Sequence, residues 1–90
     1  MPVVWKSKAL RKLESIIDYI EARNPAAAER IGAAIRHAAD RLPDHPYMHR
    51  PGRVPGRREA MAHPNYVLIY RVKADAIQIL ALHHTRQQYP

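Results

Sequence analysis

The alternation of hydrophobic and polar positions divides the chain into a short strand, two helices and three further strands. Val3-Val4-Trp5 combines β-branched and aromatic residues, which is typical of a strand. From Ser7 to about Arg23, apolar residues recur at helical spacing and charged residues fill the opposite face. This pattern predicts an amphipathic helix with Ser7 as its N-terminal cap. Its apolar face consists of Ala9, Leu10, Leu13, Ile16, Ile17 and Ile20.

Asn24-Pro25 separates this helix from a second one. Asn caps helices well, Pro is favoured at the first helical position, and the residue before a Pro resists continuing a preceding helix. Because the connection is so short, the two helices are expected to form an antiparallel hairpin. The second helix carries an apolar stripe of Ala28, Ile31, Ile35, Ala38 and Leu42, with small residues that allow close packing.

The second half of the chain predicts a loop followed by strands. Residues 43–56 hold four prolines and two glycines in 14 positions, a pattern too broken for a helix or a strand. Strand patterns follow at 57–63, 66–72 and 76–82, and the second is apolar on both faces, which predicts a central strand. The order β-α-α-β-β-β predicts an α+β fold in a single domain over residues 1–90. In that fold a helical hairpin packs on a small antiparallel sheet, which the first strand can join.

Charge adds an expectation about partners. The net charge is +7, from 15 Lys and Arg against 8 Asp and Glu, and eleven of the basic residues are Arg. Arginine favours planar, bidentate contacts to phosphate or carboxylate, although a basic surface can also serve solubility alone. Residues 43–90 contain seven basic groups and three acids, Asp44, Glu59 and Asp75. This uneven distribution favours an anionic partner, either a nucleic acid or an acidic protein segment.

Several other kinds of chemistry are not expected. Without cysteine there is no disulfide and no thiolate metal site, which suits the cytoplasm. No apolar run is long enough for a signal peptide or a membrane helix, so we expect a cytoplasmic protein without a membrane partner. His45 and His49 are four residues apart, but in a Pro-rich loop that spacing does not align them as metal ligands. We therefore expect no metal and no cofactor.

The order of elements, taken with a set of short motifs, resembles the RelE/ParE superfamily of toxins from bacterial type II toxin–antitoxin pairs. The resemblance covers nearly the whole chain. The Asn24-Pro25 step followed by alanines and the Arg86-Gln87 ending are more similar to ParE than to RelE. The motifs that carry the resemblance are Arg53, Gly56, Arg58-Glu59, Tyr66, Tyr70-Arg71 and His84-Thr85-Arg86-Gln87.

Three functions follow as alternatives. Similarity to ParE implies a toxin that binds and poisons DNA gyrase without catalytic residues of its own. Similarity to RelE implies an endoribonuclease that cuts mRNA on the ribosome. A plain binding module without toxicity is the third. RelE-type ribonucleases combine lysines with arginines, whereas this chain has no Lys between Lys12 and Lys73, which favours gyrase. Both toxin alternatives imply growth arrest and a hetero-oligomer with a cognate antitoxin.

The candidate site residues form three groups. His83 and His84 are adjacent on a strand, so at most one of them faces any one site. The target-contact candidates are Arg53, Arg57, Arg58, His84, Arg86 and Tyr89. If the chain is a ribonuclease, the catalytic candidates are Arg58, Arg71, His84, Arg86 and Tyr89. The antitoxin-binding candidates lie on the helical hairpin and are Leu13, Ile17, Ile20, Ile31 and Ile35.

Overall fold

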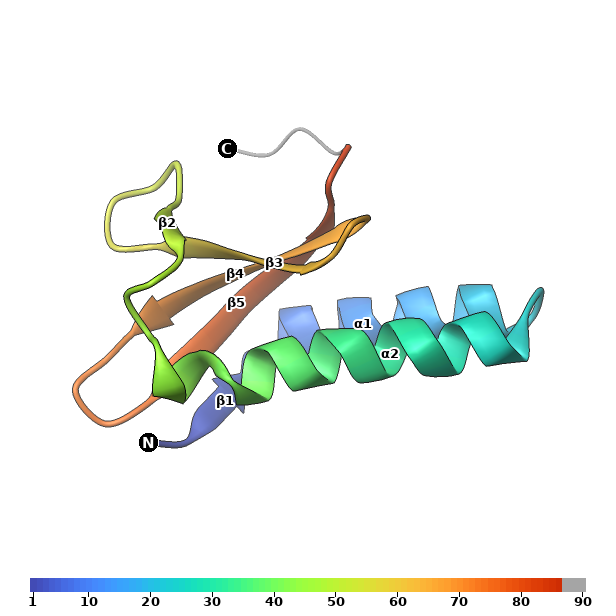
Figure 1. Cartoon of the computed structure of the whole chain (residues 1–90), viewed down its shortest axis with the longest axis horizontal. Coiled ribbons are helices and arrows are strands. Elements are labelled where there is room, and N and C mark those ends of the chain that lie inside the picture. Colours follow the sequence, from blue (N-terminus) through green and yellow to red (C-terminus); the bar gives the residue numbers. More distant parts are fainter. Residues whose placement is uncertain (87–90) are drawn as a thin grey trace.

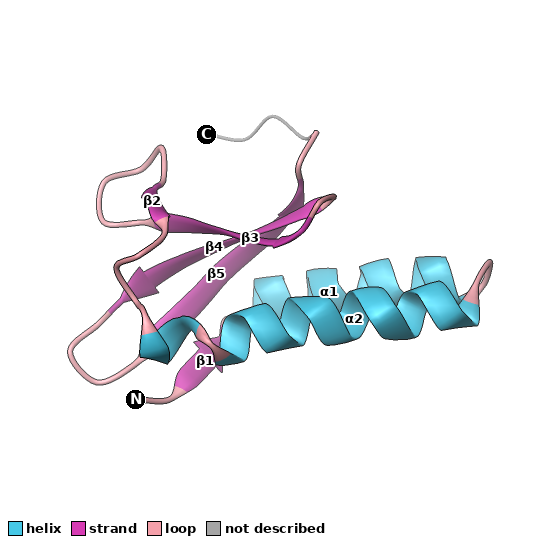
Figure 2. Cartoon of the chain, viewed as in Figure 1, coloured by secondary structure: helices cyan, strands magenta, loops and turns pink. Residues whose placement is uncertain are grey.

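The structure, a computed structural model that describes residues 1–86, places two helices against one face of a five-stranded sheet (Figures 1 and 2). The predicted α+β fold and its order of elements are confirmed. None of the described helices is long and apolar enough to cross a membrane. The elements are β1 (Val3–Trp5), α1 (Ser7–Glu21), α2 (Pro25–Asp40), a 3₁₀ turn η1 (Leu42–Asp44), β2 (Arg50–Pro51), β3 (Arg58–His63), β4 (Tyr66–Val72) and β5 (Ile77–His84).

The strand order is β1-β5-β4-β3-β2, so β4 is the central strand, as predicted. Strands β3, β4 and β5 form an antiparallel meander. Two features differ from the predictions of an antiparallel sheet and of a loop at 43–56 without helix or strand. Strand β1 pairs in parallel with β5, held at its ends by Ile77 N–H to the Pro2 carbonyl and Lys6 N–H to the Ile79 carbonyl, both 2.9 Å. The short β2, inside the predicted loop, pairs antiparallel with β3.

The helix boundaries follow local capping with one exception. Asn24 caps α2 as predicted, because its side-chain oxygen accepts from the Ala27 N–H at 3.0 Å, and Pro25 is the first helical residue. The prediction of Ser7 as the cap of α1 is wrong. Ser7 is already helical, and the cap position belongs to Lys6, which makes no side-chain cap bond. The Lys6 N–H is bonded to β5, so pairing of β1 determines where α1 begins.

The core lies between the helical hairpin and the sheet. Leu13 of α1 and Ile35 of α2 are buried there against Leu68 and Tyr70 of β4 and neighbouring strand residues. A β-bulge interrupts the β4–β5 pairing, because Tyr70 pairs with Ile79 but Ile69 with Ala81. One extra residue on β5 reverses the alternation of its side chains. The sheet face away from the helices therefore presents Ile69, Ala81 and His83; we call it the open face.

Candidate functional site

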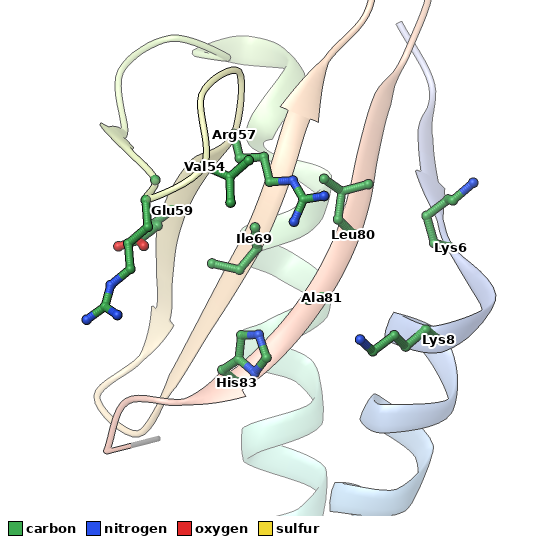
Figure 3. Close-up of a pocket in the computed structure, with 11 residues that line it drawn as sticks. Lys6, Lys8, Val54, Arg57, Glu59, Ile69, Leu80, Ala81 and His83 are labelled. Atoms are coloured by element: carbon green, nitrogen blue, oxygen red, sulfur yellow. The ribbon is translucent and has the colours of Figure 1, made fainter. Parts of the chain in front are cut away.

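A cleft of about 410 Å³ lies on the open face of the sheet (Figure 3). Ile69 and Leu80 lie in its middle, with Val54 and Arg57 on one side, Lys6 and Lys8 on the other, and His83 at one end. Arg57 and Lys8 both extend toward the strands between them. We call it the basic cleft, and its lining consists of Lys6, Lys8, Gly52, Arg53, Val54, Arg57, Glu59, Ile69, Leu80, Ala81 and His83.

The turn before β3 brings Val54 and Arg57 to the cleft. The Arg57 N–H donates to the Val54 carbonyl at 3.1 Å, and Gly56 between them has φ 82°. Pro55 followed by a residue of positive φ fits a type II turn, in which glycine is strongly favoured at that position. The Gly52 N–H donates to the Arg57 carbonyl at 2.6 Å. A side chain at Gly52 would crowd that carbonyl, since its Cβ would lie 3.1 Å from the oxygen.

Positive charge continues from the basic cleft onto α1. A second hollow of about 300 Å³ shares Lys8, Ala81 and His83 with the cleft and adds Arg11 and Lys12. Burial lowers the pKa of His83, and the charges of Lys12 and Lys8 lower it further. His83 therefore favours its neutral form at neutral pH.

Glu59 is the acidic residue in the lining of the basic cleft. Its side chain is only 7% exposed and accepts from the Arg50 Nε at 2.8 Å. The Arg50 charge thus offsets the carboxylate, and the cleft keeps an excess of cations. Cations arranged around a partly apolar floor suit a phosphate or carboxylate ligand that also brings apolar contacts.

The structure separates the predicted target-contact residues. Arg53 and Arg57 line the basic cleft. Arg58 lies on the helix-facing side of β3, where it donates to the carbonyls of Tyr47 at 3.2 Å and His49 at 2.8 Å. Arg58 therefore anchors the loop before β2.

Two C-terminal members of the predicted set, His84 and Arg86, lie away from the cleft. His84 points to the helix-facing side beside Tyr66, with ring centroids 5.4 Å apart. Its Nδ1 accepts from the Arg86 N–H at 3.1 Å. Arg86 is exposed in the turn after β5. Tyr89 lies outside the described residues.

The ribonuclease candidates do not form one cluster within residues 1–86. Arg71, another catalytic candidate, has its Nε bonded to the Gln78 side-chain oxygen at 2.7 Å. Its position on β4 puts Arg71 on the open face, whereas Arg58 and His84 lie on the other side of the sheet. Over the same residues, no three or more His, Asp or Glu side chains stand close enough to bind a metal.

Three cleft residues, Lys6, Lys8 and His83, were not among the predicted target contacts. The lysines are close to the cleft only because β1 pairs with β5, which is distant in sequence. His83 is there because the bulge reverses the alternation along β5. The available signal in the sequence was a basic residue on each side of Ser7. By itself this signal does not show which surface of the fold the two lysines face.

The predicted antitoxin-binding residues lie partly inside the protein. Leu13 is 2% exposed and Ile35 is 0% exposed, so both belong to the core. Ile17, Ile20 and Ile31 are half-buried. The stripe mainly joins the hairpin to the sheet and leaves little apolar surface for a partner.

With its helical hairpin, mixed sheet and basic open face, the chain belongs to a family of bacterial toxins. The family model described as the ParE toxin of the type II toxin–antitoxin system parDE matches residues 3–89, and the chain is a member of that family.

Individual relatives agree with this assignment. A Sinorhizobium fredii protein that carries the name toxin Y4kP is 41% identical over 87 residues, covering 96% of this chain and 90% of that protein. Toxin RelE2 of Caulobacter vibrioides is 35% identical over 82 residues, covering 91% and 92%. A solved structure titled chromosomal ParDE TA system from P. aeruginosa aligns with a TM-score of 0.83 at 27% identity, covering 93% of this chain and 95% of that one.

Proposed function

We propose that this toxin arrests growth in the cytoplasm by binding and poisoning DNA gyrase through its basic cleft, and that a cognate antitoxin neutralises it. The observation that carries the proposal is the arrangement of Arg57 and Lys8, which extend over the cleft from opposite sides (Figure 3). Fixed cations on both sides of an apolar floor provide an anion-binding surface. Such a surface needs no metal, no cofactor and no proton transfer.

The spatial separation of the catalytic candidates supports binding rather than catalysis. RNA cleavage requires a base, a cation for the phosphate and an acid around one scissile bond. Arg58 supports the loop before β2, and His84 lies on the helix-facing side of the sheet. The match to the ParE family model also supports the proposal that DNA gyrase is the target.

Ribosome-dependent mRNA cleavage is the second candidate, and one observation favours it. His83, a residue able to transfer a proton near neutral pH, lies in the basic cleft beside Lys8. A relative that is 35% identical also bears the name Toxin RelE2. In this alternative His83 would carry the proton, and Arg57 and Lys8 would stabilise the phosphate charge.

Two assays on purified toxin separate these alternatives. The first measures supercoiling by gyrase together with trapped cleaved DNA, and the second measures mRNA cleavage on programmed ribosomes. We expect the wild-type toxin to inhibit supercoiling and to trap cleaved DNA. We expect the double variant Arg57→Ala/Lys8→Ala to lose both effects. The matched control is Arg30→Ala/Lys73→Ala, which removes two positive charges from exposed positions outside the cleft.

A substitution of His83 distinguishes binding from catalysis. His83→Gln keeps a polar side chain but cannot transfer a proton. If the toxin binds gyrase, the variant should retain most of its inhibition, because the cleft cations are unchanged. Ribosome-dependent cleavage by the wild type, lost in His83→Gln, would overturn the gyrase proposal and make the chain an enzyme.

A further inference from the structure

Another hollow, of about 330 Å³, is distinct from both the basic cleft and the hollow beside Arg11 and Lys12. It lies on the helix-facing side of β3, away from the basic cleft. It is bounded by the C-terminal half of α2, the loop after η1 and the middle of β3, and it shares no lining residue with the basic cleft. We call it the α2–β3 groove. Its lining consists of Ala34, His37, Ala38, Arg41, His45, Met48, His49, Ala60, Met61 and Ala62.

The walls of the α2–β3 groove are formed largely by small apolar side chains. Four alanines line it, two from α2 and two from β3, and these short side chains leave room for larger ones from a partner. Met48 borders the groove and is 67% exposed. Exposed methionines are costly in water and adapt well to apolar partners, so they are frequent at binding surfaces.

The polar groups of the groove are basic. Arg41 is charged, and His37, His45 and His49 add imidazoles, whereas no acidic residue lines the groove. Burial lowers the pKa of His49, and the charges of Arg58 and His45 lower it further, so His49 favours its neutral form and Arg41 supplies the positive charge of the groove. This electrostatic environment complements an acidic partner segment.

The groove is also held in shape before any partner arrives. The Tyr70 hydroxyl donates to the Pro46 carbonyl at 2.7 Å, and the Tyr70 ring meets His49 edge to face, with centroids 6.1 Å apart. Arg58 also donates a hydrogen bond to the His49 carbonyl, which further fixes this loop. Binding to a preformed surface loses less conformational freedom than binding to a mobile loop.

We propose that the α2–β3 groove is the docking surface for a segment of the cognate antitoxin that carries large aliphatic side chains between acidic ones. This inference rests on the proposed function, because it takes the antitoxin as partner. It replaces the hairpin stripe as the main contact surface, since Leu13 and Ile35 of that stripe are buried in the core. The aliphatic side chains fill the alanine-lined space, and the acids meet Arg41 and the imidazoles.

The first test uses the absence of cysteine in the chain. Met48→Cys places a single thiol in the groove, and Ala74→Cys places the control thiol in the exposed turn between β4 and β5. The probe is the full-length antitoxin that restores growth when co-expressed with the toxin. We expect the antitoxin to slow alkylation of Met48→Cys by about tenfold or more, because a buried contact excludes solvent, and to leave Ala74→Cys unchanged. Equal alkylation rates for Met48→Cys with and without antitoxin would overturn the proposal.

The second test changes charge instead of access. Arg41→Glu reverses a charge in the groove, and Arg30→Glu reverses one on an exposed face of the same helix. We expect Arg41→Glu to weaken antitoxin binding by about tenfold and Arg30→Glu by about twofold or less, measured by calorimetry on variants with wild-type circular dichroism. Equal weakening in the two variants would contradict the proposal.

Two other outcomes have distinct meanings. Protection of Met48→Cys that grows with toxin concentration in the absence of antitoxin would show a second copy of the chain in the groove, and would also overturn the proposal. Growth arrest without antitoxin, measured in parallel for the wild type, reports on the proposed target function. A failure of growth arrest is therefore distinguishable from a failure of docking.

Discussion

Arg57 and Arg58 are adjacent in sequence but serve different faces of the sheet, so the same substitution should have different effects at the two positions. Arg58→Ala removes two hydrogen bonds from a charged donor, one partly buried bond of 2.8 Å to the His49 carbonyl and one exposed bond of 3.2 Å to the Tyr47 carbonyl. A bond to a charged group contributes about 1.5–3 kcal/mol, and exposure to water reduces the second. We therefore expect Arg58→Ala to lower the free energy of unfolding by about 2 kcal/mol.

The assay is thermal unfolding of the purified toxin by circular dichroism. For a domain of this size, about 2 kcal/mol corresponds to a fall in Tm of about 8–16 °C. Arg57→Ala is the matched control, because Arg57 is exposed and extends over the basic cleft. Its unfolding free energy should change by about 0.5 kcal/mol or less, while growth arrest is lost.

A second readout follows the same loop. The Arg58 charge is one cause of the low pKa of His49, so Arg58→Ala should raise that pKa toward its ordinary value. An NMR titration of the histidine ring signals in both variants measures the change, and Arg57→Ala should leave His49 as it is in the wild type.

Two outcomes would refute this reasoning. If Arg58→Ala keeps the wild-type Tm and the wild-type His49 pKa but abolishes growth arrest, Arg58 is a target contact and not a support of the loop. If Arg57→Ala lowers Tm as much as Arg58→Ala, the assignment of the two side chains to opposite faces is wrong.

Three further predictions concern capping, the core and the cleft. Asn24→Ala should lower the free energy of unfolding by about 1 kcal/mol in denaturant titrations, and Ser7→Ala by clearly less, because Asn24 caps α2 whereas Ser7 lies inside α1. Leu13→Ala should cost about 2–5 kcal/mol by the same measurement, whereas Leu10→Ala, at an exposed position, should cost much less. A bound anion should raise the lowered pKa of His83, so the affinity for sulfate should increase as pH falls toward the lowered pKa of the free protein, and His83→Gln should remove this pH dependence.

Most of the fold could be predicted because its signals are local. Asn24-Pro25 provides both a cap and a favourable first helical residue, and the structure uses both. The apolar run of Tyr66–Val72 predicts a central strand, and β4 lies between β5 and β3 in the sheet. The parallel pairing of Val3–Trp5 with β5 could not be read in the same way, since it joins the two ends of the chain. That pairing also moved the start of α1 away from the predicted cap.

The composition of the basic cleft was harder to predict for a related reason. Regular alternation from Ile77 and Ile79 would place His83 on the helix-facing side and His84 on the open face. The bulge at Leu80 inserts one residue and exchanges the two histidines, so His83 is the one that lines the cleft. A bulge in β5 leaves no clear mark in an apolar sequence such as Ile77–Leu82. Arg53 and Arg57 come from a local turn, and both line the cleft.

The positions of the cleft and the groove bear on how an antitoxin would neutralise this toxin. The two sites lie on opposite sides of β3, and the loop between η1 and β2 contributes only to the groove. That loop is held by hydrogen bonds from Tyr70 and Arg58, and none of its residues lines the cleft. We therefore infer that filling the groove does not by itself disable the cleft. An antitoxin docked there must continue past the edge at β2 and cover the cations around Arg57 directly.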